Sequence, residues 1–324
     1  MEKEMPSPQP GEVLLKIIYA GFCGSDLNTF LGMNPMVRMP VIPGHEVSAV
    51  IQAVTTGVPE SISVGMRCTV NPYTSCGSCP SCRNGRPNAC QFNQTLGVQR
   101  DGAMCEYVVL PWQKVIVDDQ ISARDLVLVE PLSVGFHAVS RGAVTDLDVV
   151  MVIGCGMIGT GAIIRAALRG ARVIAVDMDR DKLALARQLG ATDTIHSAEE
   201  DVQARVMALT NGMGPDVVIE AVGSPVTYRM AIDLVAFTGR VVCIGYAKAE
   251  ILFETKYFVS KELDIRGSRN ALPEDFRAVI AYIKRHKLPA SLITAVYRPE
   301  EAGEALRFWS ENRGNVLKII LTFE

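Results

Sequence analysis

Between about residues 148 and 267 the sequence alternates apolar runs with helical segments, and this pattern restricts the fold more than any other feature. Six apolar runs have the length of strands: 149–153, 173–177, 193–196, 216–222, 240–245 and 263–267. Helical patterns such as DKLALARQLG and QARVMALTNG lie between them and end in glycine. This alternation predicts an α/β fold, a doubly wound parallel sheet with helices on both faces.

The flanking parts of the chain have a different pattern. EVLLKIIYAGF, EVSAVIQAV and EYVVLP in the first third are β segments separated by loops rich in Gly, Pro and Asn. The segment after Gly267 is too short for a domain of its own and ends in another β segment, NVLKIILTF. We therefore expect residues 131–267 to form a domain inserted into a mainly-β domain of residues 1–130 and 268–324.

Length, charge and hydropathy exclude several classes of protein. The 324 residues are 48% apolar, enough for two cores, and the net charge of −3 mixes both signs, so we expect no nucleic-acid and no membrane partner. Residues 149–168 have the length of a membrane span, but their glycines and Arg165 favour a strand, a turn and a buried helix. The first residues contain no apolar stretch typical of a signal peptide, and we expect a cytoplasmic protein.

Four cysteines lie close together in the run CGSCPSCRNGRPNAC: Cys76, Cys79, Cys82 and Cys90. Their spacing lets four thiolates converge on one tetrahedral ion. Four sulfur ligands that leave no open position describe a structural zinc site. A pair of disulfides is the alternative, and it needs an oxidising compartment.

The motif GCGMIG follows the run 149–153 directly and opens a helical segment. Gly154 permits the tight turn, Gly156 lets a pyrophosphate approach the backbone, and Gly159 allows close helix–strand packing. Met157 and Ile158 begin the helix, whose N-terminus offers free N–H groups and a positive dipole end to phosphate. The motif predicts a dinucleotide-binding loop, with plain packing of the glycines as the alternative.

Asp177 ends the following strand, where its charge bears on the choice of cofactor. A carboxylate there can accept hydrogen bonds from the adenosine ribose and would repel a 2′-phosphate, which favours NAD over NADP. Arg180 and Lys182 keep NADP open, because either cation could turn toward a phosphate. We include Lys182 among the predicted cofactor-binding residues.

Two further fragments contain metal-binding residues: Cys23 in CGSD, and His45 with Glu46 in GHE. A thiolate, an imidazole and a carboxylate with room for water describe an open, catalytic zinc site. Such an ion would lower the pKa of a substrate hydroxyl. Taken alone, His45 also fits an ordinary polar residue with satisfied hydrogen bonds.

Taken together, five motifs resemble those of the zinc-dependent medium-chain alcohol dehydrogenases: CGSD, GHE, the cysteine cluster, Glu130-Pro131, and GCGMIG with Asp177. The resemblance covers nearly the whole chain and is strongest to the polyol and sugar-acid branch, the sorbitol, idonate, galactonate and gulonate-type dehydrogenases. Those enzymes carry an acidic residue at the Glu130 position, where simple alcohol dehydrogenases have a cysteine. The resemblance implies a GroES-like catalytic domain with an inserted Rossmann domain.

The resemblance also implies roles for single residues. Cys23, His45 and Glu46 would bind a catalytic zinc, while Glu130 would either bind it directly or hold its water. The cysteine cluster would hold a second, structural zinc. Arg269 falls where related polyol enzymes place an arginine near the substrate, although a solvated arginine or a cofactor-phosphate contact is the alternative.

Proton transfer is the role that the resemblance implies for the segment after Cys23. Ser25 would take the alcohol proton and pass it on through the nicotinamide ribose, and Asp26 would orient His45. The family usually has a histidine three residues after the relay hydroxyl. This chain has Asn28 there, which cannot titrate.

The implied function is oxidation of a secondary hydroxyl of a polyol or sugar acid, with hydride transfer to NAD, by a homodimer or homotetramer. Oxidation of an amino alcohol such as L-threonine is one alternative, and a non-enzymatic zinc- and nucleotide-binding regulatory protein is another. Metal counting separates the enzyme from the non-enzymatic protein, because about two zinc ions per chain support the enzyme and one would mean an empty catalytic site. A zinc-free quinone reductase of the same fold is opposed by the complete ligand sets.

Overall fold

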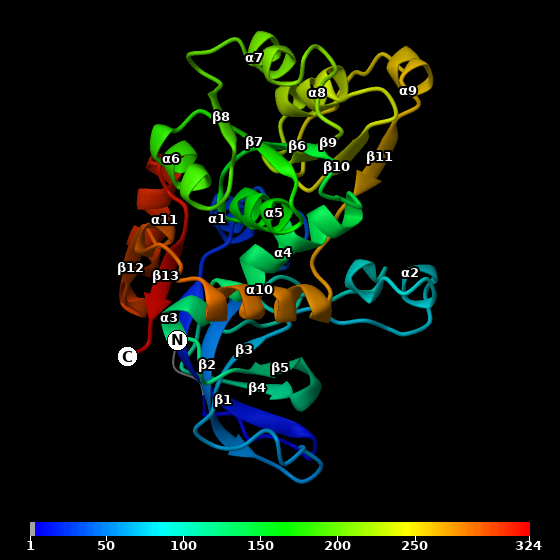
Figure 1. Cartoon of the computed structure of the whole chain (residues 1–324). Coiled ribbons are helices and arrows are strands. Elements are labelled where there is room, and N and C mark those ends of the chain that lie inside the picture. The colour runs from blue at the N-terminus through cyan, green and yellow to red at the C-terminus, as the bar shows by residue number, and fades with distance from the viewer. Residues whose placement is uncertain (1–3) are drawn as a thin grey trace. The chain divides into compact units, whose positions relative to one another are not determined.

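The computed structural model describes residues 4–324, which divide into two compact units (Figure 1). The composite unit consists of the residues up to Pro131 together with Leu272–Glu324, and the inserted unit is Leu132–Ala271. No helix among the described residues is long and apolar enough to cross a membrane. Residues 149–168 form strand β6 (Val149–Ile153), a glycine turn and helix α5 (Met157–Leu168).

The inserted unit contains the predicted parallel sheet, with strand order β11-β10-β9-β6-β7-β8. Each of the six predicted runs contains one strand. Besides β6, these are β7 (Arg172–Asp177), β8 (Asp193–His196), β9 (Val217–Glu220), β10 (Arg240–Cys243) and β11 (Asp264–Gly267). The first strand, β6, lies beside β9, where the strand order reverses. Doubly wound sheets bind ligands beyond the carboxyl ends of strands at such a point.

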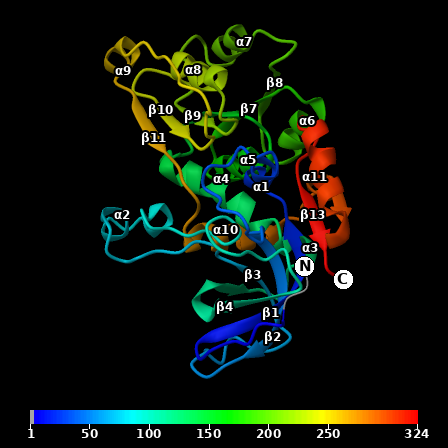
Figure 2. The same cartoon turned by 180° about the vertical axis from the view of Figure 1, so that it is seen from behind.

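Both faces of the central strands of this sheet are buried, as the apolar runs predicted, while the edge strand β11 is mostly exposed. Val150 and Val152 of β6 pack with Ile163 of α5 on one face, while Met151 packs with Val206 on the other. Figures 1 and 2 show α7 and α8 on one side of the strands and α5 on the other. The remaining helices of this unit are α6 (Arg180–Gln188), α7 (Val202–Leu209), α8 (Pro225–Leu234) and α9 (Lys256–Ser260).

A mainly antiparallel sheet forms the composite unit, in the order β12-β13-β1-β2-β3-β5, with β4 also paired to β1. Its strands are β1 (Glu12–Gly21), β2 (Glu46–Val54), β3 (Arg67–Val70), β4 (Tyr107–Pro111), β5 (Val115–Val117), β12 (Ala295–Tyr297) and β13 (Ile319–Thr322). The C-terminal β13 pairs antiparallel with β1, Tyr19 lying opposite Thr322. This pairing places the last part of the chain beside β1.

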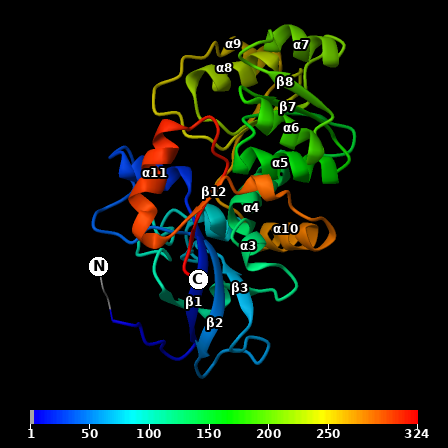
Figure 3. The same cartoon turned by 90° about the vertical axis from the view of Figure 1, so that its left-hand side faces the viewer.

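Helices complete the composite unit around the end of β1. Helix α1 (Gly24–Phe30) follows that strand, and α11 (Ala302–Glu311) lies beside α1 (Figure 3). Ala305 of α11 and Phe22, just before α1, belong to one core cluster. The other helices are α2 (Pro80–Arg83), α3 (Ala123–Leu126), α10 (Pro273–Arg285) and α4 (Val129–Arg141), which begins in this unit.

Candidate active site

The clustered cysteines come together in the composite unit, in a lobe around α2 that extends away from the sheet (Figures 1 and 2). The four ligand sulfurs lie within 4.8 Å of one another. Cys79 Sγ is 3.5 Å from Cys82 Sγ and 3.8 Å from Cys90 Sγ, far beyond disulfide length, and all nine cysteines are free. The set fits one tetrahedral ion rather than two disulfides.

Local hydrogen bonds favour the thiolate form of two of these cysteines, whereas burial and a hydrogen bond with Cys79 raise the pKa of Cys82 to about 11. The backbone N–H groups of Ser78 and Cys79 lower the pKa of Cys76. A hydrogen bond from Ser81 lowers the pKa of Cys79 to about 5, helped by the backbone of Cys82. Deprotonated sulfur is the form that binds zinc, so the donor set is suited to a metal ion.

A second group of donors forms where β1 meets β2. The two strands pair antiparallel with Gly21 opposite Glu46, which brings Cys23, just past β1, to His45, just before β2. One ligand atom from each of Cys23, His45 and Glu46 lies within 4.8 Å of the others. His45 and Glu46 are only 6% and 1% exposed. The structure therefore brings together three of the four residues predicted to bind the catalytic zinc.

Two glycines permit this close approach. A Cβ on Gly21 would lie 2.2 Å from Glu46 Oε2. Gly44 has a φ of +104°, which strains residues with a side chain, and its Cβ would lie 2.8 Å from the backbone nitrogen of Met104. The turn that presents His45 thus requires glycine.

The cluster gathers negative charge in a buried place. Burial by itself lowers the pKa of His45, but the Cys23 thiolate, Asp26 and Glu130 outweigh it and hold this pKa well above its ordinary value. Burial raises the pKa of Asp26 and of Glu130. Buried anions need a compensating positive charge, and thiolate, imidazole and carboxylate are the ligands of zinc. The residues present fit a zinc ion.

Asp26 hydrogen-bonds Cys23 and not His45. Its Oδ2 accepts the backbone N–H of Cys23 at 2.8 Å, because Asp26 is the third residue of α1 and Cys23 is the N-cap. His45 Nδ1 is buried without a hydrogen-bond partner among the described residues. The hydrogen bond expected from Asp26 to His45 is thus not formed, and Asp26 instead fixes the backbone of Cys23.

Glu130, the fourth predicted ligand, lies at the start of α4 and is 4% exposed. It is close enough to His45 and Glu46 for their charges to affect its pKa, but it is not one of the three donors within 4.8 Å. The hydroxyl of Tyr73 donates a hydrogen bond to Glu130 Oε1. Burial and the Glu130 charge raise the pKa of Tyr73 well above its ordinary value, so Tyr73 stays a donor. The sequence analysis missed Tyr73, which no motif or periodicity marks.

Lys318, just before β13, was also missed. It is 3% exposed, and its Nζ donates to Glu46 Oε1 at 2.6 Å and to the carbonyl of Phe22 at 2.8 Å. Its only sequence signal is a single charge in the apolar run NVLKIILTF. Because a carboxylate offers about four acceptor positions, Glu46 can accept from Lys318 and still bind a cation.

Ser25 lies in the first turn of α1, next to the donor cluster in sequence. Its Oγ is buried and has no hydrogen-bond partner among the described residues. The Ser25 carbonyl is engaged, since it accepts from Thr29 Oγ1 at 2.8 Å and from Asn34 Nδ2 at 3.3 Å. A buried hydroxyl without a partner is available to a ligand.

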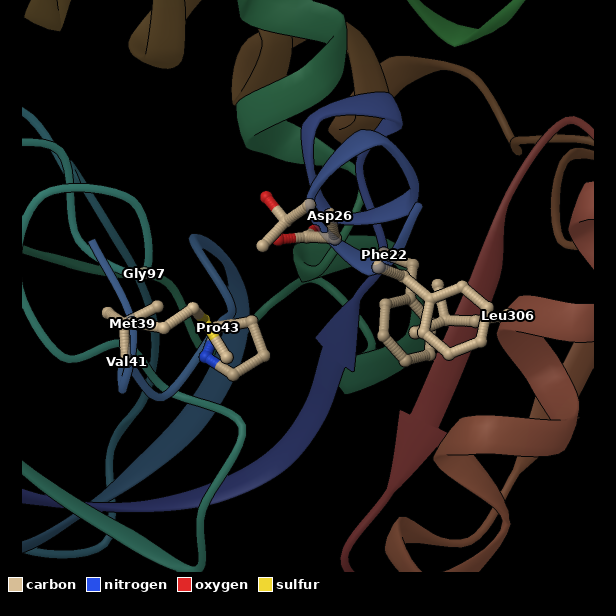
Figure 4. A pocket seen from close by; sticks show the side chains of 9 residues that line it. Phe22, Asp26, Met39, Val41, Pro43, Gly97 and Leu306 are labelled. Carbon is tan, nitrogen blue, oxygen red and sulfur yellow. The ribbon is translucent and has the colours of Figure 1, made fainter. Parts of the chain in front are cut away.

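An apolar cavity of about 150 Å³ lies on the Asp26 side of α1. In Figure 4, Phe22 and Leu306 line one side of this space and Met39 and Pro43 the other, with Asp26 between them. The three clustered metal donors are not among its lining residues. We assign no substrate to this cavity.

The predicted dinucleotide loop joins β6 to α5 in the inserted unit. Gly154 has a φ of +93°, and a Cβ on Gly159 would lie 1.8 Å from the Gly154 carbonyl oxygen. Gly156, the N-cap of α5, has no atom within 4 Å of its Cβ position, so that side of the loop is open. Met157, 6% exposed, and the partly exposed Ile158 open the helix. The open cradle fits a pyrophosphate.

Asp177 ends β7 beside this loop, as predicted. Its Oδ2 accepts the N–H of Cys155 at 2.6 Å and its Oδ1 accepts that of Met178 at 2.8 Å, which fixes the carboxylate. Arg180 pairs with Glu199. Lys182 is 9% exposed, and its N–H donates to the α6 N-cap Asp179.

Arg269 follows β11 in the inserted unit and is partly buried. Its predicted role at the substrate stays a prediction.

Comparisons with known proteins agree with both units. The alcohol dehydrogenase GroES-like domain matches residues 9–119, and the zinc-binding dehydrogenase domain matches residues 158–285. The chain is 32% identical to L-galactonate-5-dehydrogenase of Escherichia coli over 99% of its own length and 95% of the relative's. It is 33% identical to sorbitol dehydrogenase of Halalkalibacterium halodurans, with 99% and 94% covered. A short chain alcohol dehydrogenase from Escherichia coli, solved with NADH, superposes with a TM-score of 0.90 at 30% identity, with 100% and 95% covered.

A parallel sheet with a glycine loop, inserted into a GroES-like unit with two metal-donor clusters, defines a zinc-binding oxidoreductase acting on alcohols. The chain belongs to the zinc-dependent medium-chain alcohol dehydrogenases, in the branch of the polyol and sugar-acid dehydrogenases.

Proposed function

We propose that the protein oxidises a secondary hydroxyl of a polyol or sugar acid and transfers the hydride to NAD. The buried cluster of Cys23, His45 and Glu46 carries the proposal, because it is an open donor set and the four-cysteine set is closed. Relatives named for galactonate and sorbitol support the substrate class, and the relative solved with NADH supports the cofactor. The fixed charge of Asp177 supports NAD over NADP.

The donor residues and three side chains around them, those of Ser25, Tyr73 and Glu130, have separate parts in the proposed reaction. Cys23, His45 and Glu46 would hold a zinc ion, which would supply a Lewis acid and lower the pKa of the substrate hydroxyl. Ser25 Oγ, buried and without a partner among the described residues, would relay the proton that this hydroxyl releases: it would accept that proton as its own hydroxyl proton passes on to a hydrogen-bond acceptor, so that Ser25 stays neutral. Tyr73 holds Glu130 in place through its hydrogen bond.

The inserted unit supplies the proposed cofactor-binding residues and Arg269. Gly154, Gly156 and Gly159 leave room for the pyrophosphate, and Asp177 accepts from the adenosine ribose. Arg269 would bind the carboxylate of a sugar acid through two parallel hydrogen bonds.

Substitution of the metal donors tests the mechanism. We expect Cys23→Ser and His45→Ala to lower turnover by roughly a thousandfold or more, since the lost ion supplies several kcal/mol of transition-state stabilisation. NAD binding, measured by fluorescence titration, should be unchanged. His286→Ala, at an exposed position of the composite unit, is the control and should keep full turnover. Full turnover in both donor variants would contradict the assignment.

A substrate screen that follows NADH absorbance tests the reaction class. Zinc-loaded protein should reduce NAD with at least one member of a panel of aldonates and polyols. Reduction with L-threonine alone would instead support the amino-alcohol alternative. No reduction with any compound would reject the dehydrogenase function and support the non-enzymatic alternative.

A further inference from the structure

The composite unit has a second hollow, of about 340 Å³, that contains none of the clustered metal donors. It lies against β5 and the first turns of α10. Ile62, Val115 and Val117 give it an apolar lining. This volume is within the range of small-molecule sites, which combine an apolar lining with a few polar groups.

Four polar side chains line the same hollow: Ser61, Asn71, Gln113 and Arg277. Those of Ser61, Gln113 and Arg277 form no hydrogen bond or ion pair with another described residue. Asn71 uses only its Oδ1, which accepts the Tyr73 N–H at 3.1 Å, so its amide donors remain available. The hollow therefore offers one guanidinium and several neutral donors to a ligand. We call it the Arg277 hollow.

Arg277 is exposed to solvent, and no acidic side chain among the described residues forms an ion pair with it. Asp275 is buried and accepts the N–H of Leu272 at 3.0 Å, which caps α10. Asp118, which follows β5, pairs with Lys284. Glu60 and Glu274, chain neighbours of lining residues, do not themselves line the hollow. An anionic ligand would therefore find an unpaired cation there.

We propose that the Arg277 hollow is an effector site that binds a small hydroxycarboxylate. The planar guanidinium of Arg277 matches a carboxylate through two parallel hydrogen bonds. Ser61, Asn71 and Gln113 match hydroxyl groups, and the apolar lining accepts the carbon skeleton. The site is additional to the one proposed for the alcohol, and binding to it requires no turnover.

Tyr73 connects this hollow with the candidate active site. Its backbone N–H donates to Asn71, a lining residue. Its ring packs edge-on against Phe276, the neighbour of Arg277, with 6.4 Å between ring centroids. Its hydroxyl reaches Glu130. A ligand that draws Asn71 and Arg277 together therefore acts on the residue that holds Glu130, and we expect it to change kcat.

The probe is 3-hydroxy-3-methylbutanoate, whose hydroxyl-bearing carbon has no hydrogen and so cannot donate a hydride. Its neutral amide is the matched control ligand. Isothermal titration of the full-length, zinc-loaded protein should show binding of the carboxylate and about tenfold weaker binding of the amide. Arg277→Gln should weaken carboxylate binding by about tenfold or more. Arg285 is an exposed residue of the same helix and does not line the hollow, so Arg285→Gln is the control and should change binding by less than about twofold.

Turnover gives the second readout. The probe should change the kcat of the wild-type protein and of Arg285→Gln but not that of Arg277→Gln, each compared with its own rate without probe. Equal binding of carboxylate and amide, or unchanged binding in Arg277→Gln, would overturn the site. The site would also be overturned if the hollow is a contact between copies of the chain. In that case Arg277→Gln would change the oligomeric state, measured by light scattering, and would still bind the probe. Binding that leaves kcat unchanged would overturn the effector role.

Discussion

Lys318 and Glu46 form an ion pair that is almost completely removed from water, being 3% and 1% exposed. Taking both charges out of water is costly, and the pair is stable only because every partner is in place. Lys318 Nζ contacts both Glu46 oxygens and the Phe22 carbonyl. The pair fixes a proposed zinc ligand to the last strand of the chain.

Lys318→Met tests this interpretation. The substitution leaves Glu46 buried without its cation, and we expect the free energy of unfolding to fall by about 3–5 kcal/mol in urea denaturation. The double variant with Glu46→Gln should recover a large part of that loss, because the uncompensated charge is then removed. Lys16→Met, at an exposed position of β1, should change stability by less than about 0.5 kcal/mol. A single variant as stable as the wild type would show that the pair contributes nothing.

Single residues were predictable where they belong to local motifs. Cys23, His45 and Glu46 stand in short glycine-containing turns, and the structure brings their donor atoms together. Tyr73 and Lys318 reach the same place from positions without a local signal, and their partners are 57 and 272 residues away in sequence. Contacts at such separations depend on the packing of the whole unit, which no single-sequence pattern contains.

At the scale of elements, a strand could be predicted from the sequence where its apolar run was long enough to show a pattern. Each apolar run of the inserted unit overlaps a strand, and the central strands are buried on both faces, whereas the edge strand β11 is mostly exposed. Strands β3 and β5 were missed because they have only four and three residues, too few to establish an alternating pattern. The glycines of GCGMIG were predictable because each has a separate steric task.

Gly159→Ala tests the tightest of these tasks. The new Cβ would lie 1.8 Å from the Gly154 carbonyl oxygen, so the loop must shift and its backbone N–H groups must turn away from the phosphates. We expect NAD affinity, followed by fluorescence titration, to fall by about tenfold or more. Gly303→Ala in α11 is the matched control, since its Cβ would meet only Arg307 Nη1 at 3.6 Å and alanine favours a helix. Equal NAD affinity in the two variants would contradict the steric assignment.

On the scale of the whole molecule, chain order and spatial order differ. The composite unit is made from both ends of the chain, so its metal donors come from the first part and Lys318 from the last. The apolar pattern of the tail predicted its return to the first sheet, but not the ion pair that it carries. The two proposed zinc sites lie in this unit, and the dinucleotide loop lies in the other.

Cys90→Ser tests whether the cysteine lobe is independent of the dinucleotide loop. Cys90 is fully buried in the cluster, and three remaining thiolates hold zinc less well than four. We expect elemental analysis to show a fall from about two zinc ions per chain to about one, and limited proteolysis to cleave the lobe around α2 faster, because metal and not a core holds that loop. NAD affinity should change by less than about twofold, since the glycine loop belongs to the other unit. Cys68→Ala, a buried cysteine outside both clusters, should keep both zinc ions. A Cys90→Ser variant that retains two zinc ions would mean that the lobe is not the structural zinc site.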